Sequence, residues 1–269
     1  MGKFDGVLLA SDLDGTLLST DHQPSKENID AIRYFTGEGG SFTFATGRMV
    51  NAAGLFFDCV ALNAPVVVFN GAAIYDTKQK KTLYELPLPE EAYALVPEVA
   101  RRFPQIGIEV HTVDHSYAYQ GGFYTQRHFS IVNLDYHLTP LEQMERPWMK
   151  LILSCDPAFQ QEVVRYMNAD GRSAPYDLCC STPYFYEVMR RGVNKAVGIE
   201  KLRCHLGVAP EHVYTVGDNE NDVEMLKAFY SYAVRGASAG ALAAARETLS
   251  SGNDEHAIRE VIERLDGRY

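Results

Sequence analysis

The chain has 269 residues, 46% of them hydrophobic and 22% charged, and its formal net charge is −10. This length and composition suit an ordinary soluble globular protein of one large or two modest domains. The acidic balance disfavours a nucleic-acid binder, and with neither an apolar run near ~20 residues nor a basic-plus-apolar leader we expect no membrane partner.

Short apolar segments alternate with helical patterns in the first third of the chain. The predicted strands are 7–11, 42–46 and 66–69, and the predicted helices between them are 26–37 and 51–60. The strands are too uniformly apolar to have one solvated face, which is typical of a parallel sheet covered on both sides. This order predicts a βαβαβ arrangement.

The middle third is richer in β-type segments and aromatic residues. Predicted strands there are 106–111, 116–119, 149–154, 178–181 and 185–189. We interpret residues 84–188 as an α+β domain inserted into the core.

Three helices are predicted within this insert from local signals. Thr139 is a candidate N-cap followed by Pro140 and by a capping-box Glu at 142, and Asp156 precedes Pro157 in the same way. A third pattern spans 90–103, where Pro97 should kink or restart the helix.

The last third returns to the α/β pattern. It predicts strands at 213–217 and 232–234 and helices at 195–206, 222–229, 239–249 and 255–265. We therefore predict an α/β fold, a doubly wound (Rossmann-like) parallel-sheet core made of residues 1–83 and 189–269.

The cysteine pattern indicates a reducing compartment. The five cysteines are odd in number and lack CxxC spacing, so we interpret them as reduced thiols of a cytoplasmic protein. A zinc or catalytic role for the adjacent Cys179 and Cys180 is the less favoured alternative.

Two carboxylates stand at the end of the first predicted strand. Asp12 and Asp14 flank Leu13, and a Gly15 turn and the Thr16 hydroxyl follow. Two acids this close repel each other, so one pKa should rise unless a cation holds both ionised. Mg²⁺ suits such a pair because it prefers carboxylate oxygens and leaves room for phosphate ligands. A simple Asp-Gly turn is the alternative for this pentapeptide alone.

Three further segments follow at positions where a doubly wound sheet gathers its ligands. Thr46, Gly47 and Arg48 come after a predicted strand, and their hydroxyl and backbone amides could grip phosphate. Gly217 to Asp222 follows another strand and offers carboxylates for a metal, or N-caps for the next helix. Lys195 begins a helix and, taken alone, would most simply face solvent.

These four motifs, in this order, resemble those of the haloacid dehalogenase superfamily. The position of the insert resembles the Cof-like subgroup with a C2-type cap (type IIB phosphatases), as do Thr46-Gly47-Arg48, Asn70-Gly71-Ala72 and Glu187-Val188 ahead of Lys195. One departure lies after the last core strand, where the family often has Asn and this chain has Arg235 and Ser238 nearby.

The resemblance implies a catalytic role for each acid of the turn. Asp12 would be the nucleophile that forms an aspartyl-phosphate, and Asp14 would protonate the leaving alkoxide and then deprotonate water. A dehalogenase has no alkoxide to protonate, so the second acid favours phosphate chemistry.

The resemblance also implies a ligand set for metal and phosphate. Mg²⁺ would be bound by Asp12, the Asp14 carbonyl and Asp218, with Asp222 completing the metal site behind them. Thr46, Gly47, Lys195 and Asn221 would bind the phosphoryl group, and Arg48 with cap aromatics would contact the leaving group.

The predicted function is a Mg²⁺-dependent phosphatase of a small phosphorylated metabolite, by default a sugar phosphate, acting as a monomer or homodimer. A phosphotransferase or phosphomutase with the same intermediate is the first alternative. A receiver-like phosphoacceptor module and a binding protein with a vestigial site are less favoured.

Overall fold

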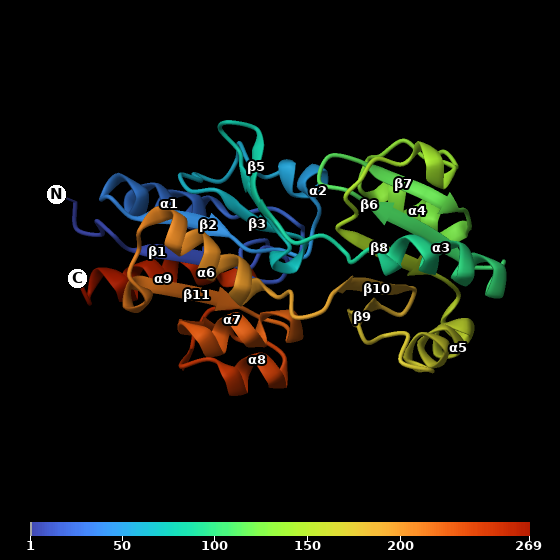
Figure 1. Cartoon of the computed structure of the whole chain (residues 1–269). Helices are drawn as coiled ribbons and strands as arrows, with labels where there is room; N and C mark the ends of the chain where they lie inside the picture. The colour runs from blue at the N-terminus through green and yellow to red at the C-terminus, as the bar shows by residue number, and fades with distance from the viewer. Residues whose placement is uncertain (1) are drawn as a thin grey trace. The chain divides into compact units, whose positions relative to one another are not determined.

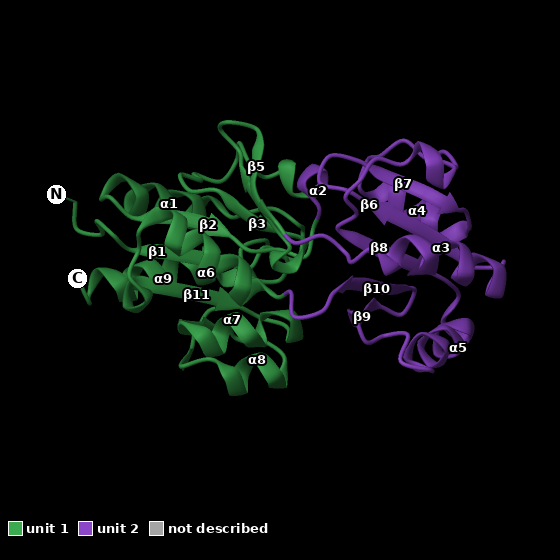
Figure 2. Cartoon of the chain, viewed as in Figure 1, with its two compact units in different colours: residues 1–48, 53–85, 194–269 green, residues 49–52, 86–193 purple. Residues whose placement is uncertain are grey.

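The computed structural model describes residues 2–269, which divide into two compact units. Figure 2 shows unit 1 (residues 1–48, 53–85 and 194–269) in green and unit 2 (residues 49–52 and 86–193) in purple. The inclusion of residues 49–52 in unit 2 was not indicated by the sequence. No helix among the described residues is both long and apolar enough to cross a bilayer.

Unit 1 is built on a five-stranded parallel sheet. Its strand order is β13 (Glu247–Thr248), β12 (Tyr230–Ala233), β11 (Val213–Gly217), β1 (Leu8–Ser11) and β2 (Ser41–Phe44). The central strands β1 and β11 are buried along their whole length, so both faces of the sheet are covered. The predicted doubly wound α/β core is confirmed.

Helices of unit 1 pack in two groups beside this sheet (Figure 1). One group is α1 (Lys26–Gly37) with α9 (Ala257–Asp266). The other is α6 (Lys195–Leu206), α7 (Val223–Ala228) and α8 (Ala239–Ala244), in which α7 contacts both of the others. Short 3-10 turns precede strand β11, helix α7 and helix α9: Pro210–His212, Glu220–Asp222 and Asn253–Glu255.

The third predicted core strand has a different partner. Strand β3 (Val66–Val68) makes one parallel bridge to the end of β2, between Ala45 and Val67, but its ladder is antiparallel with β4 (Ala73–Asp76). Strand β5 (Lys81–Glu85) completes this small sheet. The 3-10 turn Phe69–Gly71, with Asn70 at φ 52°, reverses the chain after β3 and brings β4 beside it.

Helix α2 (Val50–Gly54) is shorter than the helix predicted over 51–60. The chain continues as turns over residues 55–59. Glycine weakens a helix by its conformational freedom, so Gly54 is a natural place for this helix to end.

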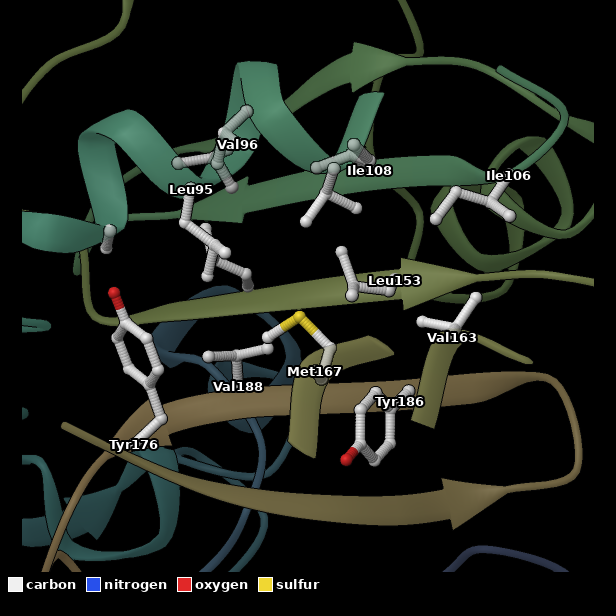
Figure 3. Packing of buried hydrophobic residues seen from close by; sticks show 14 of the residues in the cluster. Leu95, Val96, Ile106, Ile108, Leu153, Val163, Met167, Tyr176, Tyr186 and Val188 are labelled. Atoms are coloured by element: carbon white, nitrogen blue, oxygen red, sulfur yellow. The ribbon is translucent and has the colours of Figure 1, made fainter. Parts of the chain in front are cut away.

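Unit 2 contains a five-stranded antiparallel sheet. Its order is β7 (Ser116–Gln120), β6 (Gly107–His111), β8 (Lys150–Ser154), β10 (Phe185–Arg190) and β9 (Tyr176–Thr182). Helices α3 (Glu91–Arg102) and α5 (Pro157–Asn168) bury apolar side chains against one face. Figure 3 shows Leu95 and Val163 from these helices packed near Ile108, Leu153 and Val188 of the strands.

One helix prediction in unit 2 is wrong, and another is narrowed. The segment after Thr139 forms only a 3-10 turn, Leu141–Gln143, because Pro147 follows closely and cannot continue a helix. Of the two outcomes expected at Pro97, a kink or a restart, the restart does not occur. Helix α3 is one segment from Glu91 to Arg102, and its apolar stripe of Leu95, Val96 and Val99 is buried in the core of unit 2. Helix α4 (Phe123–Ile131) was not predicted.

The opposite face of the unit 2 sheet carries a buried polar cluster on its inner strands β6, β8 and β10. Glu109 and His111 alternate with the apolar residues of β6, and the Glu109 Oε2 atom lies 2.7 Å from Nδ1 of His128 on α4 and 3.3 Å from Nε2 of His111. On the neighbouring strands, Lys150 Nζ donates to Glu187 Oε2 at 2.9 Å. Charges buried this way persist only when they are paired.

This cluster predicts that acidification destabilises unit 2. Burial lowers the pKa of His111 despite the neighbouring Glu109 carboxylate. Below about pH 6.5 the unfolded histidine binds a proton that the folded one does not, so stability falls as pH drops from 7 to 5. We expect His111→Gln to flatten this decline. The only tryptophan, Trp148, is buried in unit 2, so its fluorescence during urea unfolding reports the relevant transition.

The matched control for this experiment is His137→Gln, which changes an exposed histidine of the same unit. It should keep the wild-type pH dependence. An equal decline in wild type and His111→Gln would show that His111 does not carry the effect.

Candidate active site

The site is assembled at the carboxyl ends of two adjacent parallel strands. Asp12 follows β1 and Asp218 follows β11, and the two strands are in register with Ser11 opposite Val216. The Asp12 backbone N–H extends this pairing by donating to the carbonyl of Val216 at 2.8 Å. The parallel ladder therefore brings together two acids that are more than 200 positions apart in the sequence.

The turn after Asp12 is fitted to the Asp218 side chain. Gly15 has φ +81°, and a Cβ atom there would lie 2.6 Å from Asp218 Oδ2. Thr16 Oγ1 donates to Asp218 Oδ1 at 2.8 Å. Glycine and threonine at these positions let the turn approach Asp218 and fix the orientation of its carboxylate.

Lys195 is completely buried between two of the acids. Its Nζ donates to Asp12 Oδ1 in a very short contact and to Asp222 Oδ1 at 2.6 Å. Asn194 caps helix α6 by accepting from the Val197 N–H at 3.1 Å, which places Lys195 in the first turn. The simple expectation of a solvent-facing lysine does not hold.

Burial and charge together shift the pKa values of this cluster. The pKa of Asp12 is raised, first by burial and then by the carboxylates of Asp222 and Asp218, in spite of Lys195. The pKa of Asp218 is also raised, chiefly by burial. Burial alone would lower the pKa of Lys195, but Asp12 and Asp222 outweigh it and raise that pKa. More negative charge is gathered here than one lysine neutralises.

Asp222 has structural partners on both oxygens. Its Oδ2 accepts the backbone N–H groups of Asp218 and Asn219 at 2.9 and 3.0 Å, while Oδ1 accepts from Lys195. The alternative left open by the sequence, N-capping of the following helix by this side chain, is not what the structure shows: Asp222 makes no side-chain cap bond to α7. Its bond to the Asn219 N–H belongs to the capping box of the 3-10 turn Glu220–Asp222, and it fixes the loop that carries Asp218.

The acid cluster has the donor set of a divalent-cation site. Asp12, Asp218 and Asp222 each offer a carboxylate oxygen, and these three atoms lie within 4.8 Å of one another. Oxygen ligands from several carboxylates suit a hard cation such as Mg²⁺ or Ca²⁺. The raised pKa values fit this interpretation because a bound cation would relieve the repulsion among the carboxylates.

The Asp14 side chain is outside this group. Its two oxygens accept from Arg48, Oδ2 from Nε at 2.8 Å and Oδ1 from Nη2 at 2.6 Å. The Asp14 side chain is 44% exposed, whereas that of Asp12 is 6% exposed. The two acids of the turn therefore have different environments.

Asn70, which the site prediction did not include, lies beside Thr46, Gly47 and Asn221. Asn70 Oδ1 accepts from Asn221 Nδ2 at 3.2 Å, and a Cβ atom on Gly47 would lie 3.0 Å from the same oxygen. Thr46 is buried, and its backbone N–H donates to Val67. The Asn70-Gly71 pair at the end of an apolar run was the available signal, because such pairs often adopt positive φ.

Comparison with known proteins decides the family. A sequence model of the haloacid dehalogenase-like hydrolases matches residues 9–262, nearly the whole chain and all four motifs. The chain belongs to the haloacid dehalogenase-like hydrolases. Together with relatives named phosphatases, this makes it a phosphoric monoester hydrolase and confirms the family resemblance.

Individual relatives of this haloacid dehalogenase-like hydrolase cover most of its length. An HMP-PP phosphatase of Yersinia pseudotuberculosis is 30% identical over 81% of this chain and 80% of its own. A haloacid dehalogenase-like hydrolase structure from Bacteroides thetaiotaomicron has a TM-score of 0.86 at 24% identity, and the match covers 96% of this chain and 99% of that one. The structure of the subclass IIB sugar phosphatase BT4131 has a TM-score of 0.80 at 19% identity, and the match covers 97% of this chain and 98% of that one.

At residues 235–238 the chain departs from the family pattern, yet hydrogen bonds from this segment still hold the loop that carries Asp218. Ser238 donates from its backbone N–H to the Asp218 carbonyl at 2.7 Å, and its Oγ donates to Glu220 Oε1 at 2.8 Å. Arg235 points instead to Glu255, with which it forms an ion pair. In this hydrolase, Ser238 thus holds the loop that presents Asp218.

Proposed function

We propose that this hydrolase is a Mg²⁺-dependent phosphatase that removes phosphate from a small metabolite, by default a sugar phosphate, through a phosphorylated Asp12. The observation that carries the proposal is the buried contact of Lys195 with Asp12, beside the carboxylates of Asp218 and Asp222. A carboxylate nucleophile, a fixed cation and a metal-capable acid cluster in one place are what phosphoryl transfer requires.

The proposed reaction has two displacement steps. In the first, an Asp12 oxygen bonds to phosphorus, the bond to the leaving oxygen breaks, and that oxygen takes a proton from Asp14. In the second, water attacks phosphorus while Asp14 takes a proton from the water, and the bond between phosphorus and Asp12 breaks. Inorganic phosphate leaves, and Asp12 and Asp14 return to their starting states.

The residues divide the remaining work among them. Lys195 Nζ lies on Asp12 and would neutralise charge on the transferring phosphoryl oxygens, for which Thr46, Gly47 and Asn221 supply hydrogen-bond donors. Asp12, Asp218 and the Asp14 carbonyl would hold Mg²⁺, and Asp222 would orient the Asp218 loop behind it. When bound, the ion supplies charge neutralisation for the phosphoryl group.

The experiment is a phosphate-release assay on purified chain treated with EDTA, with and without added Mg²⁺, over about a hundred phosphorylated metabolites that include sugar phosphates and HMP-PP. We expect activity that depends on Mg²⁺ and kcat/KM values that rank small phosphomonoesters first. No activity on any phosphomonoester with Mg²⁺ present would overturn the proposal.

Reaction in ¹⁸O-water separates hydrolysis from the alternative of phosphotransfer. Hydrolysis places one labelled oxygen in each phosphate released, because water attacks phosphorus. A phosphorylated acceptor with little labelled phosphate would favour a phosphotransferase or phosphomutase.

Thr16 gives a prediction about metal affinity. Thr16→Val keeps the side-chain shape but removes the hydrogen bond that orients Asp218. Loss of a residue that orients a metal ligand weakens binding by about 10–100-fold, so the Mg²⁺ concentration for half-maximal activity should rise by that order. Thr20→Val, which changes an exposed threonine bonded to Asp254, is the control and should leave it unchanged. An unchanged requirement in Thr16→Val would contradict the metal assignment.

A further inference from the structure

The contact between Arg48 and Asp14 uses both oxygens of the predicted acid–base residue. Nε and Nη2 of Arg48 approach Oδ2 and Oδ1 of Asp14 at 2.8 and 2.6 Å, which is the side-on geometry of a bidentate guanidinium–carboxylate pair. Such a pair fixes the plane of the carboxylate as well as its position, because two parallel hydrogen bonds prevent rotation.

Arg48 is itself held by its surroundings in unit 1. Its backbone N–H donates to Thr46 Oγ1 at 3.1 Å, and its guanidinium carbon lies 5.0 Å from the centre of the Phe56 ring. Stacking on an aromatic ring adds attraction and restricts the guanidinium. The arginine is therefore anchored at both ends of its side chain, which a positioning group needs to be.

The pairing is compatible with proton transfer by Asp14. A carboxylate has about four lone-pair sites, and a bidentate guanidinium uses one on each oxygen. The outer site of each oxygen stays available, and the Asp14 side chain is 44% exposed. A leaving-group oxygen can therefore still reach an Asp14 oxygen while Arg48 holds the carboxylate.

We propose that Arg48 is a positioning residue that orients Asp14 for proton transfer to the leaving group, in place of a direct contact with the substrate. This inference rests on the proposed phosphatase function. It differs from the role expected from the sequence, in which Arg48 contacts the leaving group, because the Nε–Nη2 edge of the guanidinium is directed at Asp14.

Leaving-group chemistry tests the proposal. The parameter kcat/KM ends with the first irreversible step, departure of the leaving group, and p-nitrophenolate departs without protonation whereas an alkoxide does not. Arg48→Ala should lower kcat/KM for glycerol 2-phosphate by about 10–100-fold, a part of the effect typical of general acids. It should change kcat/KM for p-nitrophenyl phosphate less than about threefold. Arg48→Lys should recover part of the loss.

A double-mutant cycle shows whether Arg48 acts through Asp14. Asp14→Asn combined with Arg48→Ala should be no slower on glycerol 2-phosphate than Asp14→Asn alone. The control Arg33→Ala, at an exposed arginine of α1, should match the wild type. If Arg48→Ala slows p-nitrophenyl phosphate equally, or slows the Asp14→Asn variant further, Arg48 binds substrate and the proposal is overturned.

The two proposals fail in different ways. A wild-type chain inactive on every phosphomonoester refutes the phosphatase function, whereas an active chain with additive Asp14 and Arg48 effects refutes only the positioning role. Thermal melting of each variant identifies loss of folding, and Arg48→Lys carries the test if Arg48→Ala does not fold.

Discussion

Asp12→Asn should abolish phosphate release while leaving the fold intact. The amide has nearly the size of the carboxylate but does not act as a nucleophile, so kcat should fall by a factor on the order of 10⁴ or more. The melting temperature should stay the same or rise, because burial and the neighbouring carboxylates raise the pKa of Asp12 and make its ionised form costly in the folded chain.

The measurement is phosphate release with Mg²⁺ present, paired with thermal unfolding. Asp135→Asn is the control, since Asp135 is an exposed aspartate of unit 2 and should retain wild-type activity. Activity of Asp12→Asn near the wild-type level would refute the proposed nucleophile, whatever its melting temperature.

Lys195→Met should destabilise the chain strongly. Methionine fills a similar volume, but the carboxylates of Asp12 and Asp222 would then face each other in a buried site without a cation. Removing one partner of a buried ion pair costs about 3–5 kcal/mol. In a protein of this size each kcal/mol shifts the melting temperature by roughly 2–4 °C.

Denaturant unfolding in EDTA and in Mg²⁺ measures this effect. Millimolar Mg²⁺ should recover part of the stability, because the ion neutralises the same carboxylates. Lys227→Met is the control: that lysine is exposed and paired with Glu224, so its loss should change stability by less than about 0.5 kcal/mol. Equal stabilities for the Lys195 and Lys227 variants would show that the buried ion pairs of Lys195 with Asp12 and Asp222 are not a net source of stability.

The parallel core and its acids could be predicted because the signals for them are local in the sequence. A run such as Gly6 to Ser11 followed by Asp12 indicates both a buried strand and its functional end, and the same holds for Val213 to Asp218. Parallel strands end at one edge, so the meeting of Asp12 and Asp218 follows once the sheet is accepted. Lys195 could be placed by order of motifs, but its complete burial could not.

Other features depend on contacts that a sequence does not display. The pairing of β3 with β4 in preference to a full ladder with β2 is decided by the reversal at Asn70, whose positive φ is one of several conformations open to Asn-Gly. The start signal at Thr139 was sound locally, yet the helix failed because Pro147 lies too near. Arg48 and Asp14 are separated by an entire helix and strand, so their pairing depends on the fold.

The position of the buried Lys195 depends on two glycines, Gly71 and Gly198, at which there is no room for a Cβ atom. A Cβ atom on Gly71 would lie 2.0 Å from the Asn194 carbonyl, and one on Gly198 would lie 2.4 Å from Val67 Cγ1. Helix α6 can approach β3 and the turn that follows it only because residues 71 and 198 are both glycine. A random-mutagenesis screen for lost activity should therefore recover alanine at residues 71 and 198 as often as changes in the acids, although neither glycine offers a chemical group to a substrate.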